Sequence, residues 1–149
     1  MCKDSFSATE VAKILGKRWS MRRVVDCTER GLCEPLEREQ YRRGYSLKSI
    51  IQLALFEELR QWGYSRAAIK GIFQEIECSE NVNDFYSHNG GGDGWWILRI
   101  TESLGSGKLV DLVKYSNTNC SSSTNNLIGI FFFNIDYLRR KVLRKINNI

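Results

Sequence analysis

Basic, hydroxyl and tyrosine side chains gather in two short stretches near the start of the chain. They are Lys17, Arg18, Ser20, Arg22 and Arg23 in the first stretch, and Tyr41, Arg42, Arg43 and Tyr45 in the second. A guanidinium donates two parallel hydrogen bonds to a guanine edge or a phosphate, and a helix amino terminus also holds phosphate. Because the helix dipole disfavours cations in a first turn, Arg22 and Arg23 indicate a functional reason for their position. Side chains of these types can therefore bind phosphate groups or base edges.

The net charge of the chain suits an anionic partner. Of 149 residues, 22 are basic and 17 acidic, so the net charge is +5 and the pI is about 9.0. A basic balance is typical of nucleic-acid binding, and many basic proteins also bind none. No apolar run reaches the roughly 18 residues of a membrane span, and no apolar stretch follows the amino terminus as in a secretory signal. We therefore expect a cytoplasmic, nucleoid-associated protein without a membrane partner.

Catalysis and metal binding have little support in the composition. His88 is the only histidine, and no nucleophile, base and orienting group are spaced as a set. The five cysteines are an odd number without Cys-x-x-Cys spacing, which favours reduced thiols over a disulfide framework or a zinc site. We expect no enzyme activity, no catalytic residue, no metal site and no cofactor.

Glycine and serine divide the first half of the chain into short helices. The serines expected to cap them are Ser7, Ser20, Ser46 and Ser65. Ser7 and Glu10 have the spacing of a capping box, and Gly16 and Gly31 end the first and second helices. Two short helices joined by a tight turn form a helix-turn-helix. We expect the second helix to turn Met21, Val24 and Val25 toward the core.

The composition changes after residue 77. Residues 78–94 are polar and contain four glycines, which predicts a flexible linker. Residues 95–103, 108–115 and 127–133 are strand-like, and the first two are joined by a glycine-containing turn. A last helix begins near Asn134 or Asp136, with many cations on one face. Its apolar stripe consists of Ile135, Leu138, Val142 and Ile146.

These elements predict an α+β fold in two domains. Residues 1–77 would form a helix-turn-helix domain of about four helices with a short hairpin or loop at residues 41–45. Residues 78–94 would be the glycine-rich linker, and residues 95–149 a small three-stranded antiparallel sheet with a carboxy-terminal helix. A sheet of this size with one helix is barely enough to fold alone, so pairing with a second copy would help to bury its apolar surface.

Several motifs of the first half share an order and an approximate spacing. They are Phe6-Ser7-x-x-Glu10-Val11-Ala12-x-Ile14-Leu15-Gly16, Arg23, Glu29-Arg30-Gly31-Leu32, Pro35, Tyr41-Arg42-x-x-Tyr45-Ser46, and Leu59-Arg60-x-x-Gly63-Tyr64-Ser65-x-x-x-Ile69. Together, residues 6–76 resemble the winged-helix DNA-binding domain of the MerR family of bacterial transcription regulators. The resemblance covers about half of the chain.

The resemblance implies which residues would meet double-stranded DNA. In the family the second helix enters the major groove and the following segment forms a wing against the backbone. Carried over, the contacts would come from the first helix start, the turn, the second helix and the wing. These residues are Ser7, Lys17, Arg18, Ser20, Arg22, Arg23, Tyr41, Arg42, Arg43 and Tyr45.

The chain departs from the family pattern in several places. The stretch from Gly16 to Gly31 is two residues longer, Val24-Val25 replaces an aromatic pair, and Gly44 is an extra residue in the wing. The long helix through which family members dimerise is replaced by the second-half module. Dimerisation would then use that module. The candidate interfaces are an edge of the sheet and the stripe of Ile135, Leu138, Val142 and Ile146.

The resulting expectation is a homodimeric transcription regulator that binds and distorts promoter DNA, where it could also contact RNA polymerase. One alternative is an architectural or excisionase-like DNA-binding factor that binds in tandem. A second is a protein-interaction module with a degenerate helix-turn-helix. A dimeric regulator predicts an inverted repeat in the bound DNA, whereas tandem binding predicts direct repeats.

Overall fold

The computed structural model describes residues 4–36, 44–79, 82–87, 95–103, 107–114 and 127–149. Contacts divide the chain into two compact units. The first unit is formed by Met1–Lys70 together with Leu138–Ile149, and the second by Gly71–Tyr137. The first unit is thus built from two segments that lie far apart in the sequence.

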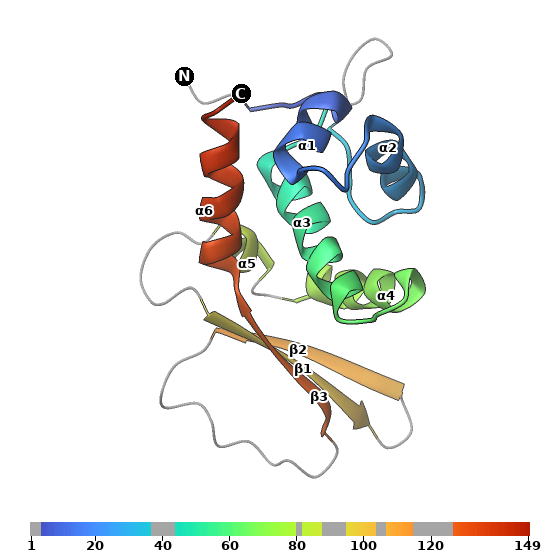
Figure 1. The fold of residues 1–149 in the computed structure, drawn as a ribbon. Coiled ribbons are helices and arrows are strands. Elements are labelled where there is room, and N and C mark those ends of the chain that lie inside the picture. Colours follow the sequence, from blue (N-terminus) through green and yellow to red (C-terminus); the bar gives the residue numbers. More distant parts are fainter. Residues whose placement is uncertain (1–3, 37–43, 80–81, 88–94, 104–106, 115–126) are drawn as a thin grey trace. The chain divides into compact units, whose positions relative to one another are not determined.

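The helix-turn-helix of the first unit consists of α1 (Ala8–Leu15) and α2 (Met21–Glu29) (Figure 1). The Glu10 amide donates to Ser7 Oγ over 3.3 Å, and the Ser7 amide donates to Glu10 Oε2 over 2.8 Å, which completes the predicted capping box. Gly16 follows α1 with a φ of 103°, a conformation that a side chain would disfavour. Ser20 caps α2 by accepting a hydrogen bond from the Arg23 amide over 3.2 Å. The two predicted helix starts are confirmed.

Helix α3 (Leu47–Gln61) is the buried centre of the first unit. Every residue from Ser49 to Phe56 is buried, as expected for a helix covered on all sides. The buried hydroxyl of Ser49 donates to the Glu34 carbonyl over 2.7 Å, so it keeps a hydrogen-bond partner in the core. Gly63, with a φ of 93°, separates α3 from α4 (Arg66–Glu77), which Ser65 caps.

The segment between α2 and α3 pairs with a residue that precedes α1 and also with itself. Phe6 and Tyr45 form an antiparallel bridge, and Leu36 and Gly44 form another. Tyr45 is fully buried, and its hydroxyl lies 3.0 Å from the Thr28 hydroxyl of α2. This segment is the base of the predicted wing. Its predicted DNA-contacting residues Tyr41, Arg42 and Arg43 lie outside the described residues.

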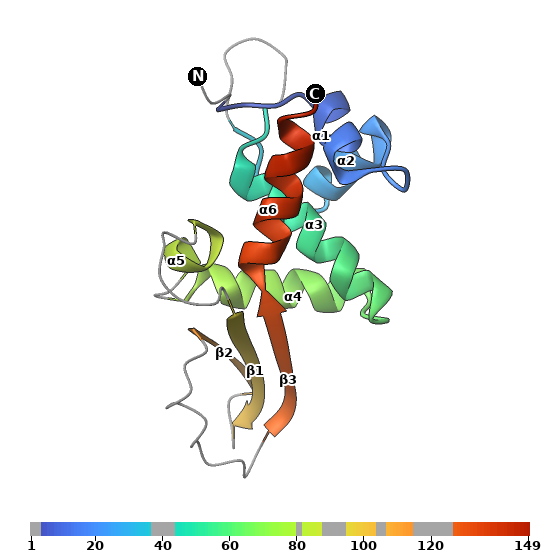
Figure 2. The ribbon, with the colours of Figure 1, turned by 60° about the vertical axis from the view of Figure 1, so that its left-hand side comes forward.

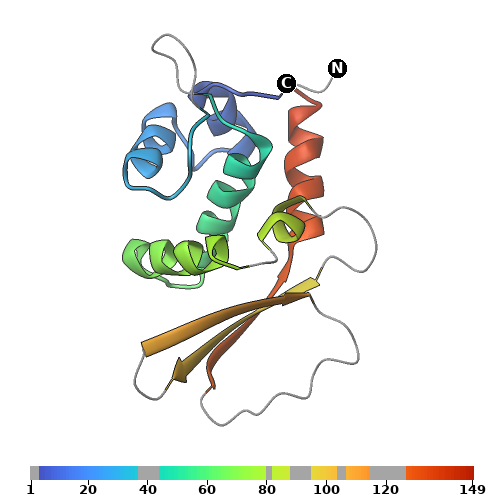
Figure 3. The same ribbon diagram turned by 180° about the vertical axis from the view of Figure 1, so that it is seen from behind.

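Helix α6 (Ile135–Ile146) contributes most of its length to the first unit, beside α1 and α3 (Figures 1 and 3). The ammonium of Lys145 lies 3.4 Å from the position that a Cβ would take at Gly16. The predicted division at residues 78–94 therefore differs from the observed units, because residues 138–149 join the helix-turn-helix.

The second unit contains α5 (Val82–Ser87) and three strands, β1 (Trp95–Ser103), β2 (Gly107–Lys114) and β3 (Leu127–Asn134). Their backbones pair antiparallel in the order β2-β1-β3, with β1 in the middle (Figure 2). The buried Trp96 of β1 meets Phe85 of α5 edge to face, with ring centroids 5.5 Å apart. Residues 82–87 thus form a helix with a buried aromatic side within the segment predicted as a flexible linker.

The predicted α+β class is corrected to a mostly helical one. Among the residues whose backbone and side chains are both described, 67% lie in helices and 7% in strands. This set holds no sheet, because of the three paired strands it includes only Trp96 and Asn134, so helices dominate the described core. Two local features explain the difference. The segment predicted as a linker contains α5, and the last helix packs with the helix-turn-helix unit.

Candidate nucleic-acid interface

The turn between α1 and α2 and the first turn of α2 present an exposed basic surface, which we call the turn surface. It consists of Lys17, Arg18, Ser20, Met21 and Arg22, all exposed. Gly16 and Ser20 shape it, because the first ends α1 and the second begins α2. The positive end of the α2 dipole points toward the same surface and favours an anion there.

Met21 is a member of the turn surface that the sequence analysis placed in the core. Its side chain is 55% exposed, whereas Val24 is fully buried. A large apolar side chain at the start of a recognition helix can pack against the methyl group of thymine. The position of Met21 next to two arginines was a signal that its side chain is exposed. Its apolar character alone predicted that it is buried.

Arg23, predicted to face DNA, instead ties α2 to α3. Its guanidinium donates to Glu57 Oε2 over 2.7 Å and to the Arg18 carbonyl over 2.8 Å. The same group lies 4.3 Å from the centroid of the Trp19 ring. Because the Arg23 side chain is only 28% exposed and satisfied by these partners, it positions the turn and does not offer a free guanidinium to DNA.

Arg18 differs from Arg23 although both approach Glu57. Its guanidinium is 3.6 Å from the Glu57 carboxylate, and its side chain is 71% exposed. An ion pair this exposed is worth little, about 0–1 kcal/mol, so Arg18 can exchange it for a phosphate. Arg18 therefore stays a member of the turn surface.

Ser7 already has partners at the start of α1. Its hydroxyl accepts from the Glu10 amide and donates to Glu10 Oε2 over 3.0 Å. The Glu10 carboxylate also accepts a hydrogen bond from the Ser7 amide. Ser7 is therefore the cap of α1, and its predicted contact with DNA stays a prediction.

Tyr45 is a second predicted contact that the structure places in the core. Its fully buried ring and its hydrogen bond with Thr28 leave no surface for DNA. The residue looked like part of an exposed loop because Arg42 and Arg43 precede it. In the structure it pairs with Phe6 and secures the base of the wing.

The apolar stripe of α6 is corrected from a dimer interface to an intrachain contact. Ile135, Leu138 and Val142 are buried, and Ile146 is partly buried. Leu138 and Val142 lie with residues of α1 and α3 around one cavity of the first unit. A stripe covered by its own chain is not free to bind a second copy.

An ion-pair cluster neutralises the only carboxylate in the middle of α2. Arg30 approaches Asp26 at 3.1 Å and Arg66 approaches it at 3.6 Å. Without these partners, the Asp26 carboxylate would repel an anion that approaches α2. The cluster therefore keeps this helix compatible with an anionic partner.

Cys27 and Cys33 of the first unit are packing residues. Burial raises the pKa of Cys27, and burial raises that of Cys33 to about 11. Both thiols therefore stay protonated at neutral pH. In the part of the chain that the structure describes, no group of three or more His, Cys, Asp or Glu residues could hold a metal ion.

No model of a known protein family matches this chain, and no curated protein matches it either. No described helix has the length and apolar character of a membrane span. The turn surface and the contacts that fix it are thus the features from which a function can be argued.

Proposed function

We propose that this chain is a sequence-specific, double-stranded DNA-binding transcription regulator of MerR type that acts in the bacterial cytoplasm. The observation that carries the proposal is the turn surface, where exposed Lys17, Arg18 and Arg22 surround the amino terminus of α2. Helix α2 would enter the major groove through this end.

Each residue of the turn surface would make a different contact with DNA. Lys17 and Arg18 would hold backbone phosphates at the edge of the groove, and Ser20 would remain the helix cap. Arg22 would donate to a guanine edge, while the neighbouring Met21 would pack on a thymine methyl group. Arg23 would keep the turn in place through Glu57 and Trp19.

The proposal includes a homodimer that distorts promoter DNA and contacts RNA polymerase there. The dimer would require an interface other than the α6 stripe, because that stripe is buried within the chain. An inverted repeat in the operator is the expected mark of such a dimer.

The first test is selection from a random duplex pool with the purified chain at physiological salt, followed by sequencing of the retained DNA. An enriched inverted repeat is the expected result. Enriched direct repeats would replace the regulator with an architectural factor. Absence of enrichment, together with a flat salt response, would contradict DNA binding and favour a protein-interaction module.

Arg22→Ala tests the specific contact. We expect a loss of about 1–3 kcal/mol, roughly 5- to 150-fold in Kd, with relaxed preference at one guanine of the selected site. Fluorescence anisotropy with the selected duplex measures the change. Lys13→Ala is the matched control, since it removes one exposed cation from α1 outside the turn surface. Equal losses in the two variants would reduce the role of Arg22 to general electrostatics.

A further inference from the structure

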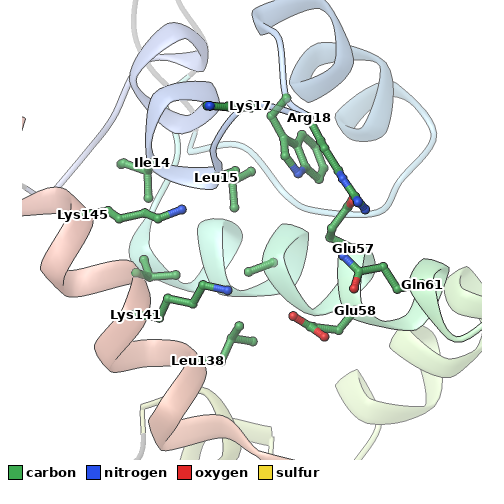
Figure 4. Close-up of a pocket in the computed structure, with 13 residues that line it drawn as sticks. Ile14, Leu15, Lys17, Arg18, Glu57, Glu58, Gln61, Leu138, Lys141 and Lys145 are labelled. Carbon is green, nitrogen blue, oxygen red and sulfur yellow. The ribbon is translucent and has the colours of Figure 1, made fainter.

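A cavity of about 150 Å³ that is open to solvent lies at the surface of the first unit, between the end of α1, α3 and α6 (Figure 4). Its apolar wall consists of Ile14, Leu15, Ala54, Leu138 and Val142. A cavity of this volume with an aliphatic lining is large enough for a benzene ring. The wall therefore fits the ring of a small aromatic molecule.

Charged groups stand at the same cavity. Lys141 and Lys145, one helical turn apart on α6, point their ammonium groups toward α1 and α3 (Figure 4). Neither ammonium forms an ion pair with any residue that the structure describes. The Glu57 carboxylate is engaged by Arg18 and Arg23, which leaves Glu58 as the other acidic group. Lys17 also lines the cavity, so three lysines without an ion pair among the described residues stand against one carboxylate and give the cavity a net preference for an anion.

We propose that this cavity is a binding site for a small aromatic carboxylate. The ring lies on the apolar wall, and the carboxylate accepts hydrogen bonds from Lys141 and Lys145. Glu58 faces the bound anion and weakens its binding by repulsion. The site depends on the position of α6, since both lysines and part of the wall come from that helix.

The cavity also touches the groups that hold the recognition helix. Trp19 and Glu57 line it, and both contact the Arg23 guanidinium of α2. A bound anion adds negative charge beside Lys17 and Arg18, which also line the cavity. We expect it to weaken DNA binding, a consequence that rests on the proposed function, whereas the binding itself does not.

The test is isothermal titration calorimetry of the full chain with sodium benzoate at constant ionic strength, without DNA. We expect saturable one-to-one binding with a Kd of about 1 mM or tighter, reasonable for so small a ligand. Benzamide, a neutral planar analogue of benzoate, is expected to bind about tenfold more weakly or worse. Glu58→Gln is expected to tighten benzoate binding several-fold.

Lys141→Gln/Lys145→Gln is expected to weaken benzoate binding about tenfold or more. Lys13→Gln/Arg144→Gln removes the same charge from exposed positions outside the cavity lining and should leave the affinity unchanged. Equal affinities of the two double variants, or no saturable binding to the unmodified chain, overturn the proposed site.

A second measurement separates the two proposals. Benzoate at saturation should lower the affinity for the selected duplex in the unmodified chain and leave it unchanged in Lys141→Gln/Lys145→Gln. Benzoate binding without any DNA binding supports the site and contradicts the proposed function. DNA binding without benzoate binding supports the proposed function and contradicts the site.

Discussion

Adjacent arginines in α2 have opposite surroundings. Arg22 is exposed on the turn surface, whereas Arg23 is enclosed by Trp19, Glu57 and the Arg18 carbonyl. The sequence suggested the same role for both, because their type and helix position are alike. The difference comes from the Glu57 carboxylate of α3, which binds Arg23 and lies 34 residues further along the chain. Residue type predicted the chemistry of this surface, and tertiary contacts decided which side chains are free to perform it.

The thiols provide a prediction at the scale of single residues. The pKa of Cys33 is raised to about 11 by burial, above its ordinary 9.0, so its thiolate fraction at pH 8 is far below that of a free thiol. We expect Cys78, which is exposed, to be alkylated by iodoacetamide at pH 8 while Cys27 and Cys33 resist. Site-resolved mass spectrometry over time measures the difference, and urea-unfolded protein is the control in which all three should react. Rapid modification of Cys33 in the folded chain would contradict its burial.

Local signals explain which elements were predictable. The starts of α1 and α2 follow from hydroxyl caps and from Gly16, and these signals act within one helical turn. Helix α5 was missed because it is short and lies in a segment rich in polar residues and glycine. Its aromatic residues Phe85 and Tyr86 were the available signal, since buried aromatic pairs are unusual in a linker.

At the scale of elements, the Arg23–Glu57 contact should hold α2 against α3. We expect Arg23→Ala to lower the free energy of unfolding by about 1–2 kcal/mol, since it removes partly buried charged hydrogen bonds. Urea denaturation followed by circular dichroism measures it. Arg22→Ala, at an exposed position one residue away, should change stability by less than about 0.5 kcal/mol. The two variants thus separate an effect on stability from an effect on DNA affinity. Equal free energies of unfolding for Arg23→Ala and Arg22→Ala would refute the positioning role of Arg23.

At the scale of the whole molecule, the first unit is completed by a segment from the other end of the chain. The apolar stripe of α6 was predictable from its helical spacing, but its partner was not, because periodicity shows that a face is buried without showing what covers it. The same limit applies to the fold class. Strand-like periodicity in residues 95–133 suggested a sheet-based second domain, while the described side chains form a mostly helical core.

Leu138→Ala tests whether α6 covers its own chain. Deletion of a buried leucine side chain should lower the stability of the first unit by about 2–4 kcal/mol, and the loss should not depend on protein concentration. Thermal unfolding at two concentrations a hundredfold apart measures both properties. Arg144→Ala, an exposed position on the same helix, is the control. A destabilisation that appears only on dilution would return the stripe to a dimer interface.

The placement of α6 also sets an order of events during synthesis. A ribosome releases residues 1–70 before it has made residues 138–149, which complete the same unit. At about 5–20 residues per second, the interval between them is roughly 3–13 s. During that interval the apolar side chains of α1 and α3 that α6 later covers face the solvent. A chaperone can therefore bind these apolar side chains of the nascent helix-turn-helix. They become covered only after α6 has been translated.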